Sequence, residues 1–178
     1  SKYDEISPVV NPNDKTLYFT RLASKDFDRT LMVEDKNLAT SLSQKAYENL
    51  LKDIYGQLAG QEVKDPISSN YNQDIWFAGI DLNQTWTKHP AYPLNNALPN
   101  SVCAYIQDSR ELLLINQFYK DGSMHPGFSM STHYTDDSFS FPSPLHIYDF
   151  YTDSKDVSIH MSEDKEVIIL SLKRKDTD

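Results

Sequence analysis

Glycine, cysteine and long apolar runs are all scarce in this sequence. Its 178 residues include five glycines and a single cysteine, so no disulfide can form within the chain. Cys103 lies in the apolar stretch 102–106, a position typical of a small buried side chain. No run of about 18 apolar residues occurs, so we expect no transmembrane segment. The first residues lack the charged and then apolar pattern of a secretion signal, and we expect no signal peptide in this chain.

Basic residues are also in short supply. The formal net charge is −9 and the sequence pI is near 4.9, because 26 acidic residues face 17 basic ones. Nucleic acid binding requires a concentrated basic surface that neutralises phosphates. The charge therefore argues against nucleic acid as a partner.

Common catalytic and metal-binding patterns are missing as well. The five histidines have neither a cysteine companion nor the i, i+3 or i, i+4 spacing of zinc ligands on a helix. The acidic clusters fall in turn-like stretches, where they favour turns and solubility over paired acid and base chemistry. No Gly-x-Ser-x-Gly elbow is present. We predict no catalytic, cofactor-binding or metal-binding residues and no cofactor.

One stretch, Ile6 to Arg21, is repeated twice further along in weaker form. Residues 9–19 align with residues 104–114 and with residues 159–169. Each copy has a short apolar run, a polar turn that includes a basic residue, and a second apolar run. This order predicts a β-hairpin in each of three units.

Two further strands complete the first two units. In the first unit they are Asp74 to Leu82 and Thr85 to Leu94, and in the second they are Gly127 to Tyr134 and Phe139 to Leu145. Prolines mark the last strand of each unit as an edge strand. The first unit is 40 residues longer than the second, and the excess lies between its second and third strands.

That excess contains an amphipathic pattern that predicts one helix from Leu38 to Leu58. Its apolar stripe is expected to face protein, and Gly60 is its expected C-terminal stop. Two interpretations stay open, a lid over the sheets or an arm that binds a partner. The stripe consists of Leu38, Leu42, Ala46, Leu50, Ile54 and Leu58, widened by Tyr47, Leu51 and Tyr55.

Four short strands per unit, a proline-bearing edge and a period near 50 residues predict a mainly β protein made of propeller blades. We expect a partial β-propeller over residues 1–178, with a blade at 6–95 that carries a helical insertion at 24–72, a blade at 100–146 and a half blade at 156–174. Two and a half blades form an incomplete ring.

The repeated sequence motifs resemble those of the Tol-B-type or WD-like propeller repeats of cell-envelope proteins. The matching motifs are the turn Asn11 to Lys15, the strand start Asp74-Ile75-Trp76 and the edge Trp86-Thr87-Lys88. The turn glycine of the family is replaced in this sequence by Asp14, Ser109 and Asp164. The resemblance implies a periplasmic or outer-membrane-associated protein. It also implies a non-catalytic scaffold for protein–protein or cell-wall interactions, and the alternative is the propeller domain of a glycan- or peptide-acting hydrolase.

Aromatic residues offer the remaining candidate sites. Trp76, Trp86, Phe139 and Phe141 occupy repeat positions, which favours packing between blades over a sugar-stacking platform. Candidate partner-binding residues lie on the helix and in an aromatic stretch outside the repeats: Tyr47, Leu51, Tyr55, Tyr148, Phe150 and Tyr151. The expected partner is another protein, a further propeller segment supplied by another chain, or a cell-wall component.

Overall fold

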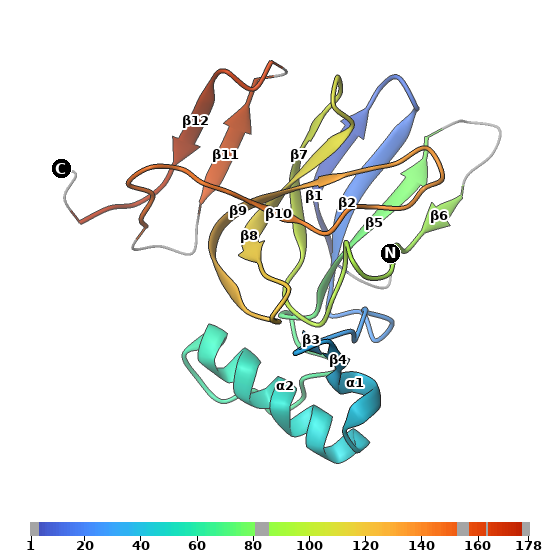
Figure 1. The fold of residues 1–178 in the computed structure, drawn as a ribbon, viewed down its shortest axis with the longest axis vertical. Coiled ribbons are helices and arrows are strands. Elements are labelled where there is room, and N and C mark those ends of the chain that lie inside the picture. Colours follow the sequence, from blue (N-terminus) through green and yellow to red (C-terminus); the bar gives the residue numbers. More distant parts are fainter. Residues whose placement is uncertain (1–3, 81–85, 153–156, 163, 176–178) are drawn as a thin grey trace.

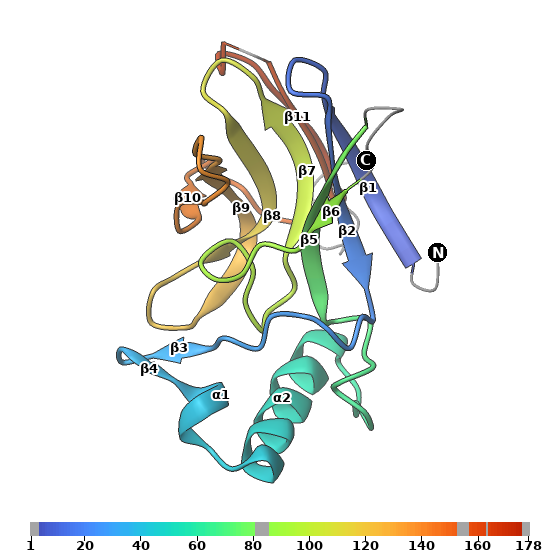
Figure 2. The ribbon, with the colours of Figure 1, turned by 90° about the vertical axis from the view of Figure 1, so that its right-hand side faces the viewer.

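The structure, a computed structural model, describes residues 4–80, 86–152, 157–162 and 164–175 (Figure 1). It is mainly β, with antiparallel sheets and two helices. The helices lie at one end of the sheets, and the turns of the three repeated hairpins lie at the other (Figures 1 and 2).

Each of the first two units forms a four-stranded antiparallel meander, as the repeat predicts. The first sheet has the order β1-β2-β5-β6, with β1 Asp4–Asn11, β2 Thr16–Leu22, β5 Gln73–Gly79 and β6 Thr87–Lys88. The second has the order β7-β8-β9-β10, with β7 Ser101–Ile106, β8 Glu111–Phe118, β9 Met124–Thr132 and β10 Ser143–Leu145.

The two edge strands are shorter than expected. β6 ends at Lys88, and the chain from His89 to Asn100 is an irregular segment rather than part of a strand to Leu94. Pro90 and Pro93 explain this, because proline offers no N–H to a strand ladder. β10 is only three residues long and begins directly after Pro142.

The third unit is a two-stranded sheet of β11 Ser158–Met161 and β12 Ile168–Ser171. Its register differs from that of the first two hairpins. The first two hairpins pair Asn11 with Thr16 and Ile106 with Glu111, but Met161 pairs with Ile168 instead of Glu166. The third turn therefore takes two more residues than the repeat predicts.

The turns themselves share one backbone feature. The basic residues Lys15, Arg110 and Lys165 have left-handed φ angles of 48°, 55° and 62°. Asp14, Ser109 and Asp164, which stand where the family has glycine, do not need a left-handed conformation, because the residue after each of them adopts it. A hairpin turn closed by a left-handed residue fits the right-handed twist of its strands.

The three sheets lie side by side, with β1 against β7 and β7 against β11. A core between the first two sheets contains Tyr18, Ile75, Phe77, Leu94, Val102, Tyr105, Leu112, Leu114 and Phe139. A second core between β7–β10 and β11–β12 contains Ile106, Leu113, Phe128 and Met161. The described residues form no closed ring, so their assignment as propeller blades remains a prediction.

The insertion lies between β2 and β5, where the length difference places it, but it forms two helices instead of one. α1 Leu38–Ser41 and α2 Gln44–Ala59 are separated at Leu42, which has an extended backbone. The Ser43 hydroxyl accepts a hydrogen bond from the Ala46 amide and so caps α2. Gly60 ends α2 with a φ of 68°, as predicted. A short hairpin precedes the helices, formed by β3 Met32–Val33 and β4 Lys36–Asn37, and the sequence did not indicate it.

The helix faces protein along the predicted stripe, but the residues that widen the stripe are its most buried part and Leu42 lies outside it. Tyr47, Leu51 and Tyr55 are at most 5% exposed, whereas Leu42 is 38% exposed. The tyrosine hydroxyls donate to the Arg29 and Ala97 carbonyls, at 2.5 and 2.7 Å. These three side chains are core, so they cannot form an exposed docking surface. Leu50, Ile54 and Leu58 are only partly buried at the edge of the same cluster.

We expect Leu51→Ala to lower the free energy of unfolding by about 2 to 5 kcal/mol, because it leaves a cavity in this core. Leu42→Ala is the matched control and should change it by less than about 0.5 kcal/mol. Urea denaturation measures both. Equal losses in the two variants would contradict the observed orientation of the helix.

Candidate functional site

The most buried carboxylate with a titratable partner is Asp74, at the start of β5. It is 1% exposed, and its Oδ2 atom accepts a hydrogen bond from the Asp28 amide at 2.5 Å. The same atom lies 2.6 Å from Nε2 of His89. Its Oδ1 atom has no hydrogen-bond partner in the described part of the chain. Burial raises the pKa of Asp74 to about 6, although the hydrogen bonds from His89 and Asp28 oppose that shift.

Aromatic stacking holds His89 in place. Its ring lies parallel to that of Trp76, with centroids 4.2 Å apart. The guanidinium carbon of Arg21 lies 4.1 Å from the centroid of the Trp76 ring, and Arg21 also forms an ion pair with Glu5 at 2.7 Å. Cation–π contact and stacking thus fix the imidazole beside Asp74.

Asp28 extends this arrangement into the irregular segments. Its carboxylate accepts hydrogen bonds from the Thr30 amide at 2.7 Å and the Tyr92 amide at 2.8 Å. Asp28, Asp74 and His89, which we call the Asp74 cluster, therefore join β5, the start of the insertion and the segment after β6. Asn95 supports the same junction by pairing with both backbone groups of Ile75, each at 2.8 Å.

An Asp–His pair can serve acid–base catalysis when the histidine faces a nucleophile or a substrate. Nε2 of His89 is already used by Asp74, and no hydroxyl or thiol among the described residues contacts the imidazole. The geometry therefore fits a structural junction better than a catalytic pair.

A second polar network joins the first two sheets. The Tyr18 hydroxyl lies 2.7 Å from Nδ1 of His133, and both residues are buried. Asp137 lies near the other ring nitrogen, at 3.4 Å, and forms an ion pair with Lys88 on β6. Burial raises the pKa of Tyr18 and lowers that of His133, while Lys88 lowers the pKa of Asp137.

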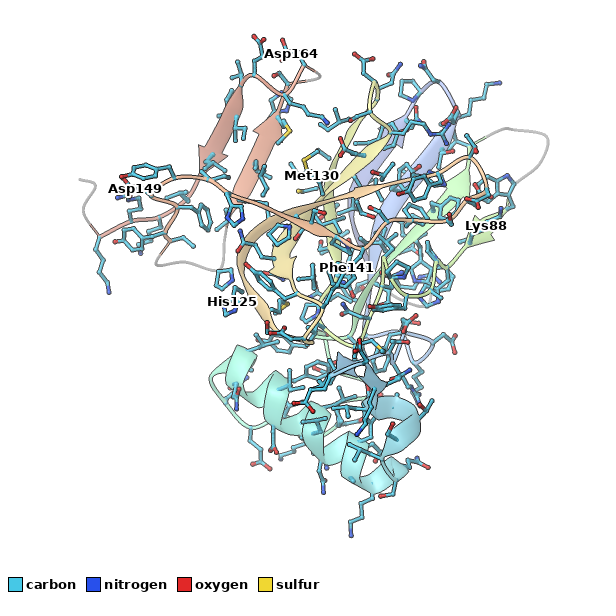
Figure 3. All side chains as sticks on the ribbon, in the orientation of Figure 1. Lys88, His125, Met130, Phe141, Asp149 and Asp164 are labelled. Carbon is cyan, nitrogen blue, oxygen red and sulfur yellow. The ribbon has the colours of Figure 1, made fainter. Side chains whose placement is uncertain are left out.

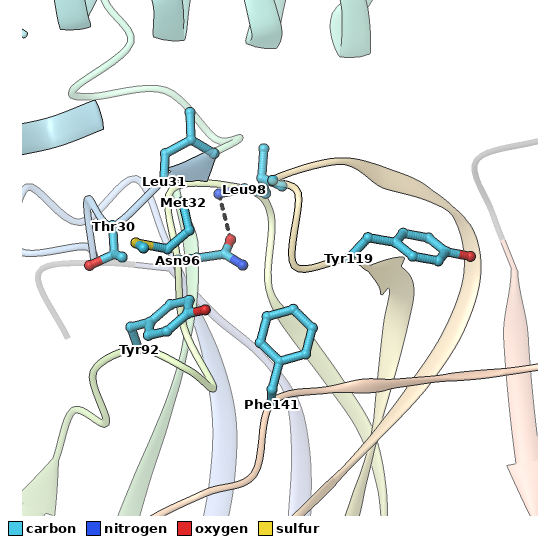
Figure 4. A pocket seen from close by; sticks show the side chains of 9 residues that line it. Thr30, Leu31, Met32, Tyr92, Asn96, Leu98, Tyr119 and Phe141 are labelled. Carbon is cyan, nitrogen blue, oxygen red and sulfur yellow. Dashed lines mark hydrogen bonds between the residues drawn. The ribbon is translucent and has the colours of Figure 1, made fainter. Parts of the chain in front are cut away.

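A small hollow lies where the insertion meets the sheets (Figure 4). Leu31, Tyr92, Asn96 and Phe141 are among its lining residues, and its volume is about 10 Å³. The Leu98 amide donates to the Asn96 side chain at 2.8 Å across one wall. Such a volume holds about one water molecule and no larger ligand.

A wider pocket of about 230 Å³ lies between β9 and the chain that follows β10. Phe150 lines it and packs edge to face on Phe128, with centroids 5.5 Å apart. Tyr148, in the same segment, is 93% exposed, and Tyr151 is 38% exposed beneath the Arg174 guanidinium. Asp149, labelled in Figure 3, marks the position of this segment beside β11–β12.

The structure thus does not bring the six predicted partner-binding residues together. Tyr47, Leu51 and Tyr55 are buried in the insertion, while Tyr148, Phe150 and Tyr151 lie beside β11–β12. The predicted packing role of the tryptophans between sheets also differs from what is seen. Trp76 stacks on His89, and Trp86 packs edge to face on Phe77 of its own sheet.

The sequence pattern does not predict the Asp74 cluster. Zinc-ligand spacing of the histidines says nothing about a contact between His89 and Asp74, 15 residues earlier. The available signal was the acidic residue that opens a fully apolar strand, since a carboxylate there needs partners.

In the described ranges, no three His, Cys, Asp or Glu side chains lie close enough together to hold a metal ion. None of the described helices is both long and apolar enough to cross a membrane. Comparisons with protein-family models, with curated proteins and with solved structures found no match for this chain.

Asp74 should give the protein a measurable pH dependence. Its folded-state pKa of about 6 exceeds the unfolded value of 3.8, so the stability that it contributes is complete below the unfolded pKa and is lost as the pH rises through 6. At about 1.4 kcal/mol per pKa unit, that loss is about 3 kcal/mol. We expect Asp74→Asn to remove this slope between about pH 4 and pH 7 in urea denaturation.

The exposed carboxylate Asp26 supplies the control, because Asp26→Asn should keep the wild-type slope. A wild-type slope in Asp74→Asn would show that Asp74 does not titrate with a raised pKa.

The network between the sheets predicts a second effect. Tyr18→Phe leaves a buried nitrogen of His133 without its partner and should lower the free energy of unfolding by about 1 to 3 kcal/mol. Tyr134→Phe removes a hydroxyl from a residue that is 48% exposed and should have almost no effect. The same urea midpoint for Tyr18→Phe and the wild type would disprove this role of the hydroxyl.

Proposed function

We propose that this chain is a non-catalytic β-propeller scaffold that mediates protein–protein or cell-wall interactions in the bacterial envelope. The observation that carries the proposal is the distribution of polar and apolar side chains. Buried polar groups join segments of the chain to one another, whereas exposed apolar side chains occur on the first and last sheets.

The internal use of polar groups supports a scaffold. The Asp74 cluster anchors the insertion, and the Tyr18–His133 contact joins two sheets. Groups committed to such contacts hold a fixed framework, which positions surface loops and faces for binding.

The exposed apolar groups supply surfaces for partners. On the first sheet Val10 is 52% exposed, and on the last sheet Ile168 and Ile169 are 36% and 61% exposed. No strand in the described ranges pairs with the second side of β12. An open strand edge with apolar side chains commonly pairs with another polypeptide.

The envelope location rests on the resemblance to Tol-B-type repeats. The four-strand order of the first two units and the side-by-side packing of their first strands agree with blades of that type. In this proposal the outer faces of the first and last sheets contact another protein.

Binding and turnover measured on the same preparation test the proposal. We expect native mass spectrometry to detect a complex heavier than the 20.5 kDa chain, or co-sedimentation to detect retention on purified peptidoglycan. We expect no release of reducing sugars from peptidoglycan and no cleavage of unfolded casein.

Two outcomes would contradict a scaffold. One is a monomer that binds no peptidoglycan. The other is turnover that is lost in Asp74→Asn and His89→Gln but kept in Asp26→Asn, which would assign the chain to the hydrolase class.

A further inference from the structure

The three hairpin turns are joined by ion pairs that repeat from sheet to sheet. Arg110, in the second turn, lies 4.0 Å from Asp14 in the first turn. Lys165, in the third turn, forms an ion pair with Glu111 at the end of the second turn. In both pairs the left-handed basic residue of one unit contacts an acid of the unit before it.

This series of ion pairs, which we call the ladder, has at each end charged groups without an ion-pair partner in the described residues, although Asp164 accepts hydrogen bonds from the Ser162 hydroxyl and the Glu166 amide. Lys15 is the left-handed basic residue of the first turn, and Asp164 and Glu166 are the acids beside Lys165 in the third. All three side chains are exposed, and none forms an ion pair within the described residues. The first sheet therefore ends in a cation, and the last sheet ends in two carboxylates.

Uncovered apolar side chains lie beside these charged ends. Val9 packs towards the second sheet, so Val10 faces away from it, paired with Leu17 on the adjacent strand. Met161 packs on the second sheet, so Ile169 and its partner His160 face outward. Each outer face thus carries an exposed apolar side chain, Val10 or Ile169. The turns that hold the groups of opposite charge lie at the same end of the sheets (Figure 1).

We propose that a second copy of this chain docks head to tail, with its first sheet stacked on the outer face of β11–β12. Val10 of one copy packs against Ile169 of the other. Lys15 of the docking copy forms an ion pair with Glu166 or Asp164 of the other copy, which adds one more ion pair to the ladder. This inference rests on the proposed scaffold function and names its partner.

Self-association measured by sedimentation velocity over a concentration series tests the proposal, with the purified chain itself as the probe. We expect the wild type to associate reversibly. Ile169→Lys and Val10→Lys should each weaken the association at least about tenfold, because each places a charge in the contact. Tyr134→Lys, at a similarly exposed position elsewhere, should leave it unchanged.

Charge reversal tests the pairing itself. Lys15→Glu and Glu166→Lys should each weaken association by up to about fivefold at low salt, and the double variant should recover it. Urea denaturation identifies any variant that fails to fold, and the remaining variants then decide the question.

A chain that stays monomeric at every concentration would overturn the inference, as would association unaffected by Ile169→Lys and Val10→Lys. Neither result removes the proposed function, since a monomer could still bind peptidoglycan. Conversely, turnover of peptidoglycan by an associated chain would remove the proposed function and leave the docking surface intact.

Discussion

The sheets of this protein pack face to face, so the apolar side chains on the facing surfaces have to be covered by the neighbouring sheet. Tyr18 shows how the chain meets this constraint. Its ring stacks on Tyr105 of the second sheet, with centroids 5.4 Å apart, and on Phe77 of its own sheet at 5.9 Å. Its hydroxyl reaches Nδ1 of His133, so the polar end of Tyr18 also has a partner. Stacking of sheets, rather than pairing of their edges, therefore holds the chain together.

The positions of the helical insertion and of the irregular segment after β6 depend on contacts with these stacked sheets. An apolar cluster that includes Leu51, Ala97 and Leu98 packs the two segments together, and buried polar groups help to fix their positions. Asp74 holds the insertion through the Asp28 amide, and Asn95 holds the irregular segment through both backbone groups of Ile75. A buried carboxylate is costly without partners, which restricts how the segments around it can move.

The local sequence pattern predicted the order of the strands in the first two units, because residues close together in the sequence determine each turn and each strand. It did not predict the register of β12, because turn length changes the pairing without changing the apolar pattern. It predicted one helix where two form, since Leu42 fits the stripe but lies at the break before Ser43. The Asp74–His89 contact could not be predicted, because it depends on how a loop returns to β5.

The central claim is that the repeated sheets stack with Tyr18 between the first two. A nuclear Overhauser spectrum of the chain with labelled tyrosine and histidine rings measures this contact directly. The account predicts cross-peaks from Tyr18 to Tyr105 and to His133, whose ring centroids lie 5.4 and 5.9 Å away. Absence of both in a folded sample, with cross-peaks from Tyr18 only to its own sheet, would contradict it.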